Sequence, residues 1–272
     1  MRVVRTGAAL GAEIHDVDFS ADLAAETVDG IHRALLDHQV VVLRAPELTV
    51  DRHVALAERF GEPEVHAFFP NLGGGHERVS VLDSEDGTRA SMWHADETFL
   101  ERPPLGTLLH AQVIPEFGGD TLWASCTAAY DALSAPMKTY LEGLTALHDL
   151  ARTVELAYVR GHATAERYAA SVAADRTTTH PVVCTHPETG ARSLYVNHTY
   201  TRSILGLPPA EADAVLAFLY RHMTTERFTY RHRWSPGDLV IWDNRCTLHN
   251  ALPDFSGHRR MHRVSVLGAR PK

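Results

Sequence analysis

The chain of 272 residues is poor in cysteine and has no long hydrophobic run. Its three cysteines, Cys126, Cys184 and Cys246, are odd in number and widely separated, which suits neither a disulfide framework nor a cysteine-based zinc site. No run of about 18 apolar residues could cross a membrane, and Met1 to Arg5 do not lead into the apolar core of a secretory leader. We therefore expect reduced, structural thiols in a cytoplasmic protein.

Positive charge is also scarce, since 26 Lys and Arg are outnumbered by 34 Asp and Glu, for a formal net charge of −8. A field of this sign does not attract polyanions, so neither nucleic acid nor a membrane is expected as a partner. Apolar residues make up 44% of the chain, which is enough for a sizeable core, and the histidines number 18.

The spacing of apolar residues predicts helices around a strand-rich core. Residues 26–38 and 209–223 carry apolar side chains at helical spacing, and another helix is expected after Thr49, a residue type that caps helices. Shorter helical pieces are expected around 127–133 and 136–143. Strands are predicted at 40–43, 105–113, 120–123, 181–185, 193–197, 228–234, 239–242, 246–251 and 259–267.

Two stretches are less regular. Residues 62–92 are rich in Pro and Gly, including Gly73-Gly74-Gly75, and form either a lid beside a site or a plain flexible turn. Residues 152–178 are polar and rich in Ala and Arg, and we interpret them as an insertion of helix and loop over the site entrance. No linker or repeat interrupts the chain, so a single domain is expected over residues 1–272.

The stretch Trp93-His94-Ala95-Asp96 carries the main chemical signal. On a β-strand, residues two apart point to one face, so this imidazole and carboxylate could reach one ion. A second imidazole from elsewhere would complete the two-histidine, one-carboxylate triad that is diagnostic of non-haem Fe(II) oxygenases. His-x-Asp alone is weak evidence, because a surface histidine near an aspartate is the commoner explanation.

The C-terminal region supplies the groups that such a triad needs. His249 follows a buried strand, and the basic cluster Arg259-Arg260-Met261-His262-Arg263 lies on the next one. The imidazole could be the third ligand. A 2-oxo acid that chelates the metal would leave its far carboxylate to be held by a guanidinium, with a hydroxyl such as that of Thr121 as helper.

Together these motifs resemble the TauD/TfdA (taurine dioxygenase) family of Fe(II)- and 2-oxoglutarate-dependent dioxygenases over nearly the full length. The stretches that carry the resemblance are Trp93-His-Ala-Asp-Glu-Thr-Phe99, Pro104-Leu-Gly106, Gly118-Gly-Asp-Thr-Leu-Trp123, His186-Pro-Glu-Thr-Gly190, Pro236-Gly-Asp238, Trp242-Asp-Asn-Arg245, His249 and Met261-His-Arg263.

The resemblance implies a mostly β fold with flanking helices around a double-stranded β-helix, or cupin-like jelly roll. It implies His94, Asp96 and His249 as catalytic metal ligands, and Thr121 with a C-terminal arginine on 2-oxoglutarate. Counting forward from the distal histidine with the family's usual spacing selects Arg260 as this arginine, whereas counting back from Arg263 selects Arg259. The two counts differ by one residue, so this chain would have lost one residue relative to the family. Such a deletion is easier in the loop before the strand than inside the strand, where it would reverse the alternation of side chains, so we favour Arg259.

The resemblance carries over to the substrate pocket in part. His66 and Arg263 match residues that bind an anionic head group, and Tyr200 falls where an aromatic wall is expected. Phe69 and Ala90 replace the Tyr and Asn of taurine enzymes, so two polar groups are lost. This pattern implies an anionic substrate that is larger or less polar than taurine, such as an alkyl sulfate, alkanoate or phosphonate.

We therefore expect a dioxygenase that consumes O2 and 2-oxoglutarate, releases succinate and CO2, and oxidises a C–H bond of a small anionic molecule by hydroxylation, elimination or desaturation. Halogenation is disfavoured because it needs a small residue in place of Asp96. A catabolic role and the biosynthesis of a natural product both remain open. The alternatives from other classes are a Zn(II) hydrolase on the same ligands and a non-catalytic metal-binding jelly roll. A homo-oligomer, dimer or tetramer, is also expected.

Overall fold

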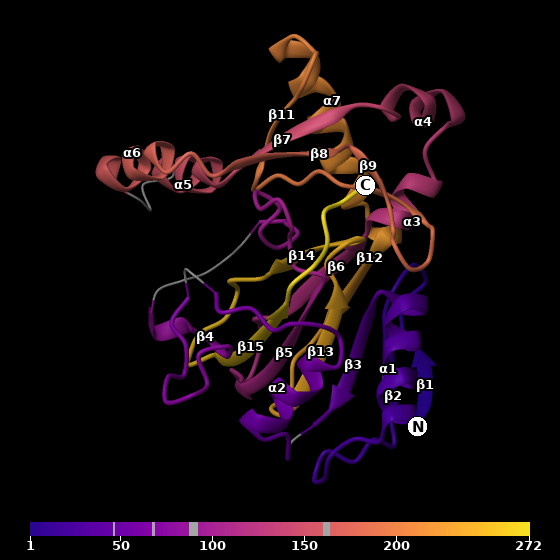
Figure 1. Ribbon diagram of the computed structural model, residues 1–272, viewed down its shortest axis with the longest axis vertical. Coiled ribbons are helices and arrows are strands. Elements are labelled where there is room, and N and C mark those ends of the chain that lie inside the picture. Colours follow the sequence, from indigo (N-terminus) through magenta and orange to yellow (C-terminus); the bar gives the residue numbers. More distant parts are fainter. Residues whose placement is uncertain (46, 67–68, 87–91, 160–163) are drawn as a thin grey trace.

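A computed structural model describes residues 1–45, 47–66, 69–86, 92–159 and 164–272, and it is a mixed α/β arrangement with several sheets (Figure 1). The largest sheet has the strand order β1-β2-β3-β13-β5-β15-β4, with β2 and β3 parallel and the other pairs antiparallel. Its strands are β1 (Arg2–Arg5), β2 (Ala12–His15), β3 (Val40–Arg44), β4 (Ser80–Asp83), β5 (Gly106–Val113), β13 (Asp238–Asp243) and β15 (Arg260–Val266).

Three smaller antiparallel sheets complete the strand content. Their orders are β12-β6-β14, β11-β7-β8 and β10-β9, and Gly190, with φ of 71°, lies in the turn of the β9–β10 hairpin. The strands are β6 (Thr121–Ser125), β7 (Thr145–Asp149), β8 (Thr177–Pro181), β9 (Val183–Thr185), β10 (Arg192–Leu194), β11 (Thr201–Ile204), β12 (Thr229–His232) and β14 (Thr247–Ala251).

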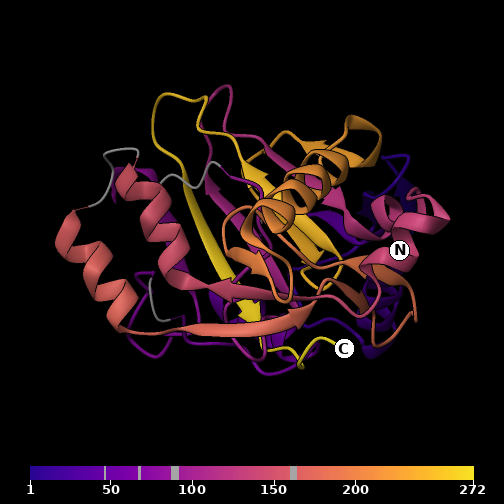
Figure 2. The same cartoon turned by 90° about the horizontal axis from the view of Figure 1, so that it is seen from above.

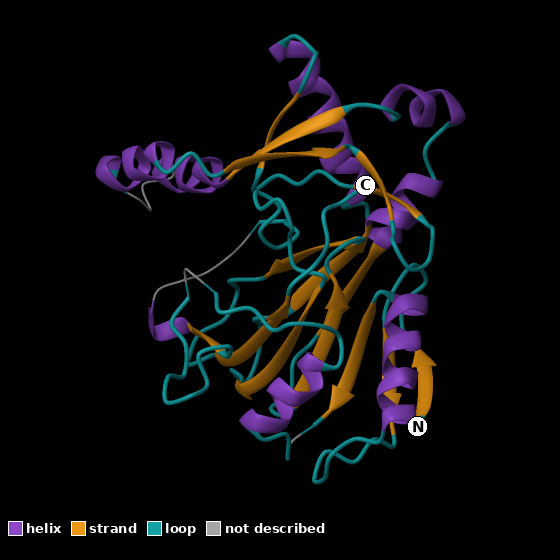
Figure 3. Ribbon diagram, viewed as in Figure 1, coloured by secondary structure: helices purple, strands orange, loops and turns teal. Residues whose placement is uncertain are grey.

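The helices lie around the strands (Figure 3). They are α1 (Ala25–His38), α2 (Val50–Glu58), α3 (Cys126–Asp131), α4 (Ala135–Leu141), α5 (Leu150–Val159), α6 (Ala165–Ala173) and α7 (Pro209–Met223), with 3-10 turns at η1 (Ser84–Asp86) and η2 (Glu226–Phe228). Helix α2 starts as predicted, because the Thr49 hydroxyl accepts a hydrogen bond from the Arg52 N–H. Helix α1 ends at Gln39, whose left-handed backbone (φ of 64°) lets β3 begin at once.

Alternating side chains give the large sheet two buried faces. On one face, Val41 and Leu43 pack with Ile31 of α1, within the core that also includes α2. On the other face, Val42 and Met261 belong to a core that includes Trp123 of the β12-β6-β14 sheet. The space between these two sheets holds the functional site described below.

The structure refines the two irregular stretches. Residues 62–92 include strand β4 and turn η1, which the sequence did not predict, and Gly73-Gly74-Gly75 all have positive φ, as a turn requires. Residues 152–178 contain most of α5, all of α6 and the start of β8. Figures 1 and 2 show α5 and α6 projecting side by side from one edge of the molecule.

Two expectations from composition can be compared with the structure. The three cysteines are buried and free. Among the residues that the structure describes, no helix is long and apolar enough to cross a membrane.

Candidate active site

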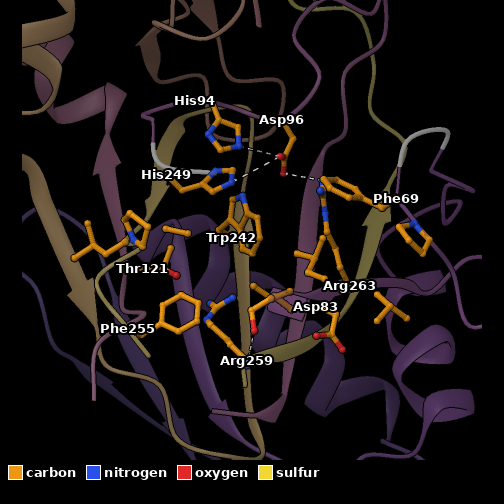
Figure 4. Close-up of a pocket in the computed structure, with 18 residues that line it drawn as sticks. Phe69, Asp83, His94, Asp96, Thr121, Trp242, His249, Phe255, Arg259 and Arg263 are labelled. Carbon is orange, nitrogen blue, oxygen red and sulfur yellow. Dashed lines mark hydrogen bonds and ion pairs between the residues drawn. The ribbon is translucent and has the colours of Figure 1, made fainter. Parts of the chain in front are cut away.

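The side chains of His94, Asp96 and His249 converge on one point (Figure 4). His94 Nε2 lies 3.6 Å from Asp96 Oδ1, and His249 Nε2 lies 3.7 Å from the same oxygen. One potential ligand atom from each residue lies within 4.8 Å of the other two. A single ion could therefore contact all three groups, as a two-histidine, one-carboxylate site requires.

The backbone brings the two histidines together in a way that the sequence did not predict. Residues 93–96 are not a strand, on which the two side chains would share a face: His94 forms an isolated antiparallel bridge with His249 of β14, and the chain turns directly afterwards. The bridge consists of two hydrogen bonds, from His94 N to His249 O (3.0 Å) and from His249 N to His94 O (2.7 Å). A partner strand at the end of the chain, rather than local alternation, therefore orients His94.

Asn244 fixes the turn that carries Asp96. Its side-chain oxygen accepts from Asp96 N at 2.7 Å, and its amide nitrogen donates to the carbonyls of Asp96 and Pro104, each at 3.1 Å. Two of the three hydrogen bonds of this buried amide hold the turn and the third ties it to Pro104, which explains the Asn of the Trp242-Asp-Asn-Arg245 motif.

The second carboxylate oxygen of Asp96, Oδ2, is bound by other side chains of the protein. Arg263 Nη2 lies 3.0 Å from Asp96 Oδ2, and the Thr107 hydroxyl donates to that oxygen at 3.2 Å. Oδ1 is the oxygen that faces the two imidazoles. The protein therefore holds the carboxylate so that one oxygen is presented to an ion.

The site favours the protonation states that bind metals. Burial alone would raise the pKa of Asp96, but Arg263 and the nearby imidazoles outweigh it and hold the pKa below its usual range. Burial, with help from His94, lowers the pKa of His249 to about 3, so its ring is neutral. Met92 O lies 2.8 Å from His94 Nδ1, an atom that donates to it when Nε2 is left as the ligand atom.

A cavity of about 130 Å3 adjoins this triad. The triad lines one part of it, and Thr121 and Arg259 line the part farther from the triad (Figure 4). Arg259 is largely buried, its Nε has no hydrogen-bond partner among the described residues, and burial lowers its pKa to about 10. A largely buried cation that lines a cavity can bind a carboxylate there.

Arg260 lies elsewhere. It is the first residue of β15, its guanidinium is 3.6 Å from Asp83, and its side chain is 39% exposed. Arg259 and Arg263 lie an even number of residues apart and both line the cavity, whereas Arg260 is not among the lining residues. The two arginines that the sequence left as alternatives thus differ in surroundings.

The predicted substrate residues that the structure describes do not all line the cavity, since His66 and Tyr200 are absent from its lining. Phe69 and Arg263 line the cavity, and the guanidinium carbon of Arg263 is 5.6 Å from the centre of the Phe69 ring. The ring centroids of His66 and Phe69 are 4.5 Å apart, and those of Tyr200 and His94 are 6.4 Å apart. Ala90 lies outside the described residues.

Glu97 was not among the site residues predicted from the sequence. It is buried beside Asp96, and its Oε1 lies 3.5 Å from His66 Nε2. Burial, together with the nearby carboxyl of Glu64, raises the pKa of Glu97 to about 8. The predicted anion site therefore also contains an acidic group, and its place directly after Asp96 in the motif was the available signal.

Aromatic lining residues were also missed. Trp242 is buried, and it also lines the cavity with its ring 4.9 Å from that of His249. Phe255 comes from the loop before β15 and lines the cavity beside Arg259. A loop aromatic gives no periodic signal, so sequence patterning could not have found it.

Comparison with known proteins gives one consistent result. The family model described as "Taurine catabolism dioxygenase TauD, TfdA family" matches residues 3–265. The chain is 35% identical over 271 residues to an alpha-ketoglutarate-dependent sulfate ester dioxygenase of Pseudomonas putida, covering 96% of this chain and 88% of that one. It is 32% identical to the alpha-ketoglutarate-dependent 2,4-dichlorophenoxyacetate dioxygenase of Cupriavidus pinatubonensis, covering 94% of each chain. A crystal structure of a taurine dioxygenase from Burkholderia xenovorans matches with a TM-score of 0.84 at 34% identity, covering 99% of this chain and 92% of that one.

Proposed function

The chain belongs to the TauD/TfdA family of α-ketoglutarate-dependent dioxygenases, and from this premise we propose that it uses Fe(II) and O2 to oxidise a C–H bond of a small anionic substrate. The observation that carries the proposal is a single cavity lined by His94, Asp96 and His249 in one part and by Thr121 and Arg259 in another. The zinc hydrolase and the non-catalytic jelly roll are set aside, because neither would use 2-oxoglutarate.

His94, Asp96 and His249 would hold the iron, and their donor set of two imidazoles and one carboxylate fits Fe(II). The bound iron would supply the activation of O2, coupled to conversion of 2-oxoglutarate to succinate and CO2. Arg263 and Thr107 would keep Asp96 ionised and correctly turned, since they hold its other oxygen. Asn244 would keep the turn rigid.

Thr121 and Arg259 would hold the far carboxylate of 2-oxoglutarate. Arg259 is the better candidate because its guanidinium is buried against the cavity, where an anion would neutralise it. Arg260 remains the less favoured alternative, because Asp83 already pairs with it and water reaches it.

The substrate is proposed to combine an oxyanion with a hydrophobic tail. His66 and Arg263 would receive the anion, while Phe69 and Tyr200 would pack against the tail, at roughly 0.8 kcal/mol per buried methylene. Sulfate esters and aryloxyalkanoates, the substrates named for two relatives, have this form. Glu97 would discriminate among anions, because a group approaching His66 also meets its carboxyl.

The outcome is proposed to be hydroxylation at the carbon next to the heteroatom. In a sulfate ester, the new hydroxyl shares its carbon with the ester oxygen. The bond from that carbon to the ester oxygen then breaks, giving a carbonyl compound, sulfate and a proton. Hydroxylation or desaturation in the biosynthesis of a natural product is the alternative use of the same site.

Membership of the family also supports a proposal about the finer architecture. We propose that the seven-stranded sheet and the β12-β6-β14 sheet are the two halves of a jelly roll, and that residues 1–272 form one domain. Residues 152–178 are proposed as a lid that closes on substrate, since none of its described residues lines the cavity in the present state. The assembly is proposed to be a dimer or tetramer.

The test is a succinate-release screen with Fe(II), 2-oxoglutarate and O2 against alkyl sulfates, aryloxyalkanoates, phosphonates, alkanesulfonates and taurine. An anion with a hydrophobic tail should outperform taurine in kcat/KM. Phe69→Tyr, which restores a hydroxyl, should narrow that gap. A neutral or cationic compound turned over best would contradict the anionic substrate class.

A further inference from the structure

Trp234 touches both groups proposed to hold the far carboxylate of 2-oxoglutarate. It lies between β12 and β13 and is buried. Its indole N–H donates to the Thr121 hydroxyl at 3.0 Å, and the guanidinium carbon of Arg259 lies 5.9 Å from the centre of its ring. In the described parts of the chain, the indole nitrogens of Trp123 and Trp242 have no hydrogen-bond partner. Trp234 thus differs from both of these neighbours.

The hydrogen bond from the Trp234 indole determines which further hydrogen bonds the Thr121 hydroxyl can make. A hydroxyl has one proton to donate and two lone pairs that accept. Because Trp234 occupies one lone pair from the protein side, the Thr121 proton is left to point elsewhere, and Thr121 lines the cavity. Its backbone is fixed between β12 and β14, where it pairs with His232 and Ala251. The hydroxyl is therefore oriented as a donor to an anion.

A second layer holds Trp234. The ring of His232 meets it edge-on at 4.9 Å, and His232 Nε2 donates to Asp238 Oδ2 at 2.9 Å. The same oxygen accepts from Ser235 N at 2.9 Å, which closes the turn directly after Trp234. Arg44 pairs with the other oxygen of Asp238. The Pro236-Gly237-Asp238 motif, to which the reaction itself assigns no role, thereby fixes the indole.

We propose that Trp234 is a positioning residue for 2-oxoglutarate: its indole N–H turns the Thr121 hydroxyl toward the far carboxylate, and its ring supports Arg259. This inference rests on the proposed function and deepens its 2-oxoglutarate site. Trp234 acts on the cosubstrate through these two residues.

The test compares two ligands that differ only at the far end. Fe(II)-loaded protein under argon is titrated by calorimetry with 2-oxoglutarate and with 2-oxobutyrate, which lacks the far carboxylate. Trp234→Phe keeps a ring and removes the N–H, so the Kd for 2-oxoglutarate should rise about 3–10-fold while that for 2-oxobutyrate stays unchanged. Trp123→Phe is the matched control and should leave both constants unchanged. Thr121→Val should weaken 2-oxoglutarate alone, and adding Trp234→Phe to it should cost little more.

Each other outcome is informative. Equal weakening of both ligands would mean that Trp234 is merely structural, and unchanged binding would also overturn the inference; in either case the dioxygenase assignment would stand. If the unsubstituted protein bound both ligands equally well, the far-carboxylate site of the proposed function would itself be wrong. Should Trp234→Phe fail to fold, the test instead follows the NMR resonance of the Trp234 indole N–H in the unsubstituted, Zn(II)-loaded protein. That resonance should shift with 2-oxoglutarate and not with 2-oxobutyrate, and an equal response to both would refute the proposal.

Discussion

Replacing Arg259 by glutamine should have opposite effects on cosubstrate binding and on the stability of the ligand-free protein. In the bound state the buried guanidinium would face a carboxylate, and losing one partner of such a pair costs roughly 2–5 kcal/mol. That range corresponds to a rise of about 30-fold to several thousandfold in the Kd for 2-oxoglutarate. Glutamine can still donate one hydrogen bond, which favours the lower half of the range.

In the ligand-free protein, the same buried charge destabilises the fold. Burial lowers the pKa of Arg259 from 12.5 to about 10, which reflects a cost on the order of 3 kcal/mol for holding the cation away from water. Its Nε has no hydrogen-bond partner in the described structure to offset that cost. The ligand-free Arg259→Gln protein should therefore be at least as stable as the parent in urea, whereas added 2-oxoglutarate should stabilise the parent alone.

Arg260→Gln is the matched control, one residue away. Arg260 pairs at 3.6 Å with Asp83 and is 39% exposed, so its loss should change both quantities by less than about 1 kcal/mol. Calorimetry and urea titration of the three proteins give the comparison. If Arg260→Gln lost 2-oxoglutarate and Arg259→Gln kept it, both the placement of the deletion before the strand and the role given to the buried cation would be refuted.

Three further outcomes are expected. His94→Ala, Asp96→Ala and His249→Ala should each abolish the visible charge-transfer band that forms when Fe(II) and 2-oxoglutarate are added without O2; an undiminished band in any of them would remove that residue from the metal site. Asn244→Ala should lower the free energy of unfolding by about 2–4 kcal/mol, measured in urea, because it strands a buried N–H and two carbonyls; a loss below 0.5 kcal/mol would show that the turn does not depend on it. Burial lowers the pKa of His53 to about 3 from its usual 6.5, so its contribution to stability is complete above pH 6.5 and falls by about 1.4 kcal/mol per pH unit below it; metal-free His53→Gln should show a shallower pH dependence than the parent, and an identical slope would contradict this.

The elements that alternate or repeat regularly were predictable from the sequence. Helix α7 has the predicted bounds, and Thr49 caps α2 as expected, because both depend on local rules. Strand β4 was missed because its short run, Ser80–Asp83, lies inside a stretch punctuated by Gly and Pro. Its pairing with β15 is a tertiary contact, which periodicity does not record.

The parts of the site that residue types and motifs identify were predictable from the sequence, whereas the contacts that depend on tertiary packing were not. The triad followed from ligand types and motif spacing, and the structure brings its three side chains together. The ion pair between Arg263 and Asp96 could not be predicted, because it depends on how β15 lies beside the turn that carries Asp96. Because of this contact, Arg263→Ala would disturb Asp96 as well as any substrate anion that Arg263 binds.

The bridge between His94 and His249 has a consequence for when the enzyme becomes able to react. A nascent or truncated chain that ends before His249 carries His94 and Asp96 but lacks the histidine that completes the group, and it also lacks the backbone partner that orients His94. Only a chain that includes β14, paired with β6, can bring the three side chains together. A chain without β14 therefore lacks both the third side chain of the group and the backbone bridge that orients the first.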